Sequence, residues 1–187
     1  GDFVMANTKI SAMTAATTPL TGSETIPLVQ SGANVQASVL QVTAATYGEI
    51  YVASGAVSQT LTNANTYYKL TAFTTDGLSN GTTPQAASDS VRIDIAGDYL
   101  IQFFITFSDS NNKTFSFRCY NETTASAYAN TVVKSHSHST DPMFIAVSAF
   151  VSAAANDVLS VQAACATAAT SITVSDGNFA ILLLKAA

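Results

Sequence analysis

Apolar and polar residues alternate with a period of two in most of the chain beyond about residue 47. Residues 91–95 and 114–120 alternate strictly, and residues 99–107 form a long aromatic run. Because successive side chains of a strand point to opposite faces, these segments predict half-buried strands. The same reasoning places further strands at residues 49–53, 66–70, 143–151, 157–162, 171–174 and 178–184.

The order and spacing of these segments predict the fold class. About eight to ten strands at intervals of about 8–15 residues, without an amphipathic helix, are typical of an all-β jelly-roll sandwich. Residues 153–156 and the pair Asp176–Gly177 are expected to be turns. The final run, residues 178–184, is apolar at every position but the first, which predicts a strand buried on both sides.

The first 46 residues follow a different pattern and predict a separate amino-terminal arm ahead of a globular domain at 47–187. Within the arm, two short extended runs flank the turn sequence Ser31-Gly32-Ala33-Asn34 and predict a small hairpin. An isolated hairpin is only marginally stable in water. We therefore expect the arm to need another surface to order it.

Composition narrows the possible partners. Of the 187 residues, 48% are hydrophobic and only 10% are charged, with a net charge of −5, whereas ordinary domains contain about 25% charged residues. The chain lacks the basic surface that nucleic-acid binding needs, and no apolar run approaches the roughly 18 residues of a membrane span. A surface made polar by Ser, Thr, Asn and Gln is suited to burial against further copies of the chain, so we expect self-association.

Three segments, residues 95–103, 155–161 and 177–183, resemble the strands of the tumour-necrosis-factor and complement-globular-head type of jelly roll. The resemblance covers about residues 48–187. It implies a homotrimer packed through aromatic and aliphatic faces, and a binding or structural module rather than an enzyme. The trimer core that it implies consists of Tyr99, Ile101, Phe103, Phe115, Phe117, Phe179 and Ile181.

The arm carries a second resemblance. Residues 9–13, 20–32 and 36–39 are similar to the amino-terminal segment of many tailed-bacteriophage virion proteins. This implies docking on a virion surface, and the major capsid protein is the expected partner. The apolar residues that would be buried there are Ile10, Met13, Leu20, Ile26, Leu28, Val29, Val39 and Leu40.

Taken together, the two resemblances predict a trimeric capsid decoration (cement) protein on the virion surface, similar to decoration proteins and head fibres. The sequence has no collagen-like or heptad spacer between arm and globule, which favours a knob close to the particle. One alternative is the receptor-binding tip of a tail fibre that recognises a host glycan or protein. Another is an adhesive or signalling module of the same fold.

Candidate chemistry is sparse, and no cofactor is expected. His136 and His138, with Asp141 three residues on, form the one metal-like group, and the alternative is a polar surface loop. No serine lies in a Gly-x-Ser-x-Gly elbow. Cys119 and Cys165 lie in apolar, strand-like runs, so we expect buried free thiols, with a bridge between them as the alternative.

Overall fold

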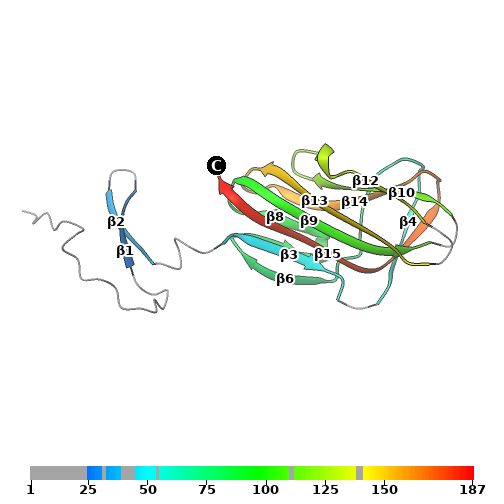
Figure 1. Cartoon of the computed structure of the whole chain (residues 1–187), viewed down its shortest axis with the longest axis horizontal. Coiled ribbons are helices and arrows are strands. Elements are labelled where there is room, and N and C mark those ends of the chain that lie inside the picture. The colour runs from blue at the N-terminus through cyan, green and yellow to red at the C-terminus, as the bar shows by residue number, and fades with distance from the viewer. Residues whose placement is uncertain (1–24, 31–32, 39–44, 54, 110–111, 138–140) are drawn as a thin grey trace, which may run out of the picture. The chain divides into compact units, whose positions relative to one another are not determined.

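The computed structural model describes residues 25–30, 33–38, 45–53, 55–109, 112–137 and 141–187, the first two ranges by their backbone alone. Contacts within the chain divide it into two units, residues 1–44 and residues 45–187. Figure 1 shows the hairpin of the first unit and the sandwich of the second. No helix in the described ranges has both the length and the apolar character needed to span a membrane.

The predicted hairpin is confirmed: β1 (Thr25–Gln30) pairs antiparallel with β2 (Ala33–Ser38). Gln30 lies opposite Ala33 and Pro27 opposite Gln36. In a hairpin closed by two residues the flanking pair exchanges hydrogen bonds, and every second pair then does the same. Pro27 falls in a pair that does not, so its missing N–H faces away from β2 and costs the ladder nothing. Of the arm residues predicted to bind a capsid, the described ranges include the backbone of Ile26, Leu28 and Val29 and omit Ile10, Met13, Leu20, Val39 and Leu40.

Residues 45–187 form two packed antiparallel sheets, which confirms the predicted all-β sandwich (Figure 1). We name the first the front sheet. Its strand order is β13 (Met143–Ala153), β9 (Gly97–Ser108), β15 (Thr170–Ala186), β3 (Tyr47–Tyr51) and β6 (Thr75–Asn80), with β4 (Val57–Leu61) also paired to β15.

We name the second the back sheet. Its order is β11 (Ser126–Ala127), β10 (Thr114–Asn121), β14 (Val158–Cys165), β8 (Ser90–Ile93) and β7 (Thr82–Gln85), with β12 (Val133–His136) beside β10 and β5 (Tyr68–Lys69) beside β14. Two short 3-10 helices, Ala86–Ser88 and Ala129–Thr131, lie in its connections.

Alternation along the strands builds the core between the sheets. In β9, Tyr99, Ile101 and Phe103 point inward, and the residues between them point outward. From the back sheet, Phe115 and Phe117 meet Phe107 of β9, with ring centroids 5.2 and 5.0 Å apart. These aromatic contacts join the two sheets into one core.

The predicted trimer core requires a correction, because the structure buries these side chains within the single chain. A side chain that is enclosed between its own two sheets has no surface left for a second chain. The residues concerned are Tyr99, Ile101, Phe103, Phe115, Phe117, Phe179 and Ile181, all 2% exposed or less. The alternate, outward-facing positions of the same strands are the ones open to another copy.

Strand β15 also differs from the prediction. The turn expected at Asp176–Gly177 is a bulge between Val174 and Asp176 within one continuous strand. A bulge inserts an extra residue without ending the strand. The end of β15 is not buried on both sides either, because Leu182 and Leu184 are exposed on the outer side.

Candidate self-association face

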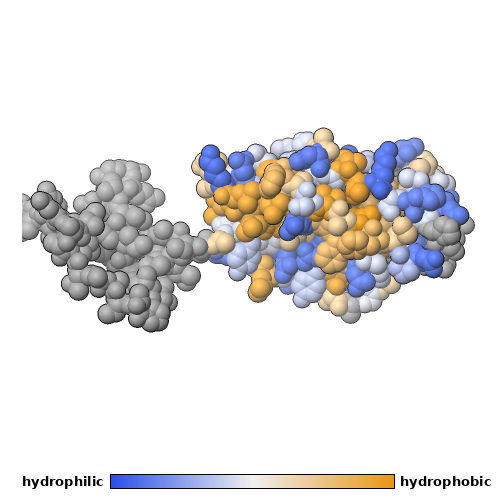
Figure 2. All heavy atoms as spheres, viewed as in Figure 1, coloured by the Kyte–Doolittle hydropathy of each residue, from blue (hydrophilic) through white to orange (hydrophobic). Residues whose placement is uncertain are grey.

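Large apolar side chains gather on the outer side of the front sheet. Of the nine large hydrophobic residues that are exposed in the described ranges, seven lie there, the most exposed being Leu78 (73%), Phe150 (68%) and Phe144 (62%). Figure 2 shows the hydrophobic surface over this sheet. We call these seven residues the apolar face: Tyr47, Leu78, Phe104, Phe144, Phe150, Leu182 and Leu184.

The register of the strands brings residues far apart in sequence into one row. Phe150 lies opposite Leu100, Leu100 opposite Leu182, and Leu182 opposite Tyr47. This row runs from the edge strand β13 across β9 and β15 to β3. Adjacent strands are about 4.8 Å apart, so the row is a continuous apolar band about 14 Å long.

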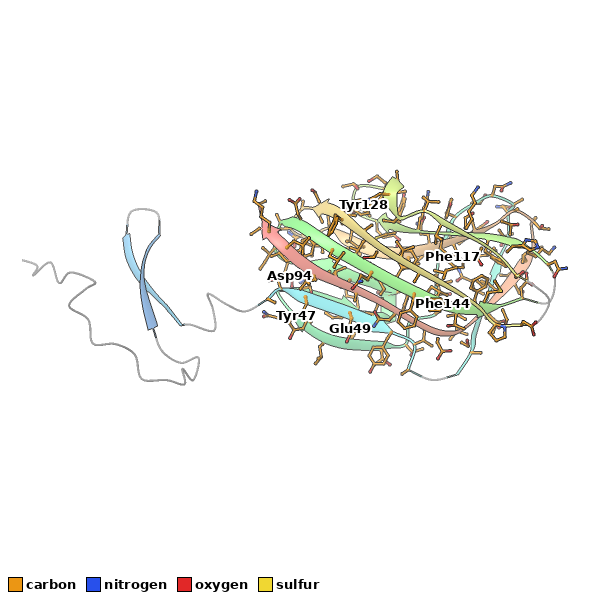
Figure 3. The ribbon with its side chains drawn as sticks, in the orientation of Figure 1. Tyr47, Glu49, Asp94, Phe117, Tyr128 and Phe144 are labelled. Carbon is orange, nitrogen blue, oxygen red and sulfur yellow. The ribbon has the colours of Figure 1, made fainter. Side chains whose placement is uncertain are left out.

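An aromatic contact lies further along β9 and β13 on the same face. The rings of Phe104 and Phe144 are 6.0 Å apart between centroids. Tyr47, Glu49 and Phe144 can be located on this sheet in Figure 3. Aromatic pairs of this kind contribute large areas to cores and interfaces. Here the pair belongs to the surface, because both residues are exposed.

The surface between these side chains is hollowed. A cavity of about 240 Å³ is lined by Tyr47, Leu78, Leu100 and Leu182, among others. Another, of about 440 Å³, lies beside Phe104 and Phe144. Protruding apolar side chains next to apolar hollows are the shape that a close-packed partner requires.

Two carboxylates on this side accept hydrogen bonds from neighbouring side chains. Asn178 Nδ2 donates to Glu49 Oε2 at 2.9 Å, and Ser152 Oγ donates to Asp98 Oδ1 at 2.5 Å. Each carboxylate would keep its neutral hydrogen-bond donor in an interface, which lowers the free-energy cost of removing it from water. Such an arrangement is suited to burial against another protein surface.

Only part of the histidine motif lies within the described residues. His136 is exposed on β12, with its Nδ1 3.0 Å from Thr114 Oγ1. Ser137 is buried, and its N–H donates to the Lys113 carbonyl at 2.7 Å. His138 lies outside the described residues, and among those described no group of three His, Cys, Asp or Glu side chains could hold a metal ion.

The two cysteines are buried free thiols, as predicted. Cys119 lies on β10 and Cys165 on the neighbouring β14, where it is opposite Phe115. Burial raises the pKa of the Cys119 thiol far above its usual range. The adjacent Arg118 points to the other face of the sheet and does not offset this effect. Neither thiol is suited to nucleophilic chemistry.

Comparison with known proteins bears on the fold. No protein-family model matches the sequence, and no curated protein matches it significantly. Among solved structures, Eiger TNF from S. frugiperda superimposes with a TM-score of 0.58 and 16% identity, covering 76% of this chain and 94% of that one. The globular domain of the zebrafish complement 1qA protein gives 0.52 and 8%, covering 76% and 99%. Murine APRIL gives 0.52 and 13%, covering 75% and 99%.

The chain has the jelly-roll fold of these domains. The expected likeness to the tumour-necrosis-factor and complement type is therefore confirmed at the level of the fold. The resemblance of the arm to phage virion proteins stays a prediction. The apolar face was missed by sequence reasoning, which assigned the inward residues of the same strands to the subunit contact. The one available signal was the apolar run at 178–184, which supplies residues to both sides of β15.

Proposed function

We propose that this protein is a homotrimeric structural protein that assembles through the apolar face and decorates a phage capsid, to which its amino-terminal arm binds. The apolar face is the observation that carries the proposal. Monomeric proteins rarely leave so many adjacent large apolar residues in water. A second copy that covers them recovers about 25 cal/mol for each Å² buried, before ordering costs. Threefold assembly is what the resemblance to this type of jelly roll implies.

Closed rings of three need two different patches on each copy, because the contact between neighbours is heterologous. The apolar face offers two: Phe144 and Phe150 on the edge strand β13, and Tyr47 with Leu78 on β3 and β6 at the other side of the sheet. The hollow beside Tyr47 and Leu78 is the size of a large side chain or two. We expect β13 of one copy to pack near β3 and β6 of the next.

The arm would dock through the edge of β2. The outer edge of β1 is interrupted at Pro27, which has no N–H to donate. The outer edge of β2 presents the backbone groups of Asn34, Gln36 and Ser38, which lie in the pairs that do not bond across the hairpin. A strand of a capsid subunit could continue the sheet there. Three arms on one trimer make a multivalent attachment, so a weak single contact becomes durable.

Sedimentation over a range of protein concentrations tests the assembly. We expect a trimer that dissociates on dilution, and a single-chain species at all concentrations would refute the proposal. Val132 provides a matched control, because it is exposed but lies outside the front sheet. Val132→Ser should leave the trimer intact, and Phe150→Ser should weaken it.

Particle binding tests the arm separately. A chain that begins at Ala45 keeps the bonds from Asn80 Nδ2 to the Ala45 carbonyl (2.7 Å) and from the Leu183 N–H to the Thr46 carbonyl (2.8 Å). It should therefore stay folded and trimeric but fail to bind purified particles. If it still coats them, the role of the arm is wrong. Many copies per particle are expected for a decoration protein, and a few copies would favour a receptor-binding fibre tip instead.

A further inference from the structure

The outer side of the back sheet carries most of the basic residues of the globular unit. Of the six Lys and Arg residues between positions 45 and 187, four lie on strands of this sheet: Lys69, Arg92, Arg118 and Lys134. In a chain of net charge −5 this is a local excess of positive charge. It lies on the opposite side of the sandwich from the apolar face, so assembly through that face would leave it open.

Arg118 is held in a specific position at the middle of this surface. Its guanidinium carbon lies 3.8 Å from the centroid of the Tyr67 ring and 5.0 Å from that of Tyr120. Its Nε and Nη2 both donate to Gln162 Oε1, at 3.0 and 2.7 Å. Rings and amide together fix the orientation of the planar guanidinium, and a fixed guanidinium binds a planar anion with little entropic cost.

The charge of Arg118 is not neutralised within the described residues, unlike the charges of Lys69 and Arg92. Lys69 pairs with Glu122 at 3.5 Å, and Arg92 pairs with Asp94 at 3.0 Å. No described carboxylate lies within ion-pair distance of Arg118, although the residue is half-buried. The bonds to Gln162 use two of the five N–H donors of a guanidinium. The remaining donors match the paired oxygens of a carboxylate.

We propose that this surface binds a sugar that bears a carboxylate, such as a sialic or uronic acid, with the carboxylate on Arg118. Lys134 adds a second positive charge: it lies opposite Ser116, which places it diagonally next to Arg118 on the same side, about 7–8 Å away. The sugar hydroxyls would find hydroxyl partners, because Ser116 and Tyr120 flank Arg118 on the same, partly exposed side of β10.

Calorimetric titration of the full-length protein tests this site. The probes are N-acetylneuraminic acid and its methyl ester, which keeps the ring and hydroxyls but has no negative charge. We expect the acid to bind and the ester to bind at least about tenfold more weakly, because charge-assisted bonds to guanidinium are lost. Equal binding of acid and ester, or no binding of the acid, overturns the proposal.

Two arginine variants separate the site from general electrostatics. Arg118→Gln should weaken binding of the acid at least about tenfold. Arg92→Gln is the matched control, since Arg92 lies on the same sheet but is already paired with Asp94, and it should bind the acid as the unaltered protein does. Equal losses in both variants would overturn the assignment to Arg118. So would acetylated glutamate binding as tightly as the sugar, because an acidic peptide would then be the better ligand. None of these outcomes depends on particle binding or trimer formation.

Discussion

Phe103 and Phe104 are adjacent on β9, are chemically identical and face opposite ways, which makes them a direct test of the two faces of the front sheet. Phe103 is 2% exposed in the core and Phe104 is 39% exposed on the apolar face. Replacing each by alanine should therefore affect different properties. Phe103→Ala should destabilise the single chain, and Phe104→Ala should weaken assembly.

The structure gives the expected sizes. Removing a fully buried phenylalanine costs about 3–5 kcal/mol in the free energy of unfolding. A phenylalanine offers about 200 Å², so the 39% that Phe104 exposes is roughly 80 Å², equivalent to about 2 kcal/mol per copy when covered. Three copies make about 6 kcal/mol per trimer, or about four orders of magnitude in the association constant. The association constant of a trimer has units of M⁻², so the concentration at the midpoint of assembly varies as its inverse square root. The midpoint should therefore rise by up to about 100-fold, and by about tenfold if half the area is covered.

Two measurements keep the effects apart. Urea unfolding, followed by near-ultraviolet circular dichroism below the concentration at which the chain assembles, reports on the single chain. In this assay Phe104→Ala should cost no more than about 1 kcal/mol, from its ring contact with Phe144. Sedimentation without urea reports on assembly. If the assembly midpoint of Phe104→Ala equals that of the unaltered protein, the apolar face is not the contact between copies.

Three further predictions concern the core. Thr131 is buried, and its Oγ1 accepts the Cys119 N–H at 2.8 Å; Thr131→Val leaves that N–H unpaired and should lower the free energy of unfolding by about 1–3 kcal/mol in urea titration. A methyl group at Gly97 would lie 2.3 Å from the Lys185 carbonyl oxygen, so Gly97→Ala should separate β9 from the end of β15. We expect the free energy of unfolding to fall by about 1–3 kcal/mol and amide exchange to become faster there. Unchanged exchange would contradict the close packing. Burial raises the pKa of the Cys119 thiol, and Cys165 is shielded from solvent at 1% exposure. Neither should therefore react with a disulfide reagent at pH 8 until urea unfolds the chain, and rapid reaction of the native protein would show that one of them is accessible.

Sequence pattern predicted the strands whose inward side is apolar. β9 and β10 alternate clearly, because each buries one side in the core and leaves the other outside. β4, with the sequence VSQTL, and β6, with TDGLSN, show no such pattern and were not predicted. Their pairing depends on partners distant in the chain: β4 adds to one end of β15, and β6 forms the edge of the sheet beside β3. The sequences of these short polar segments contain no local pattern that predicts this pairing.

The two candidate surfaces were harder to predict for the same reason. Two consecutive phenylalanines, Phe103 and Phe104, look alike in sequence, and only the register of β9 decides which one is inside. The cluster around Arg118 joins residues from three separate segments, with Tyr67 and Gln162 as its distant members. No spacing in the sequence connects these positions. Their chemistry becomes visible only when β10 lies beside β14.

The outer sides of the two sheets expose different kinds of residue. The two sheets share one core, so the outer side of each sheet is free to carry its own kind of residue. Here one side gathers the exposed apolar residues and the other gathers most of the basic ones. The apolar run at the end of β15 predicted burial on both sides, yet a single chain buries only Phe179 and Ile181 and leaves Leu182 and Leu184 in water. The proposed assembly would cover these two leucines, and this is why we look for the partner on the front sheet and for a ligand on the back.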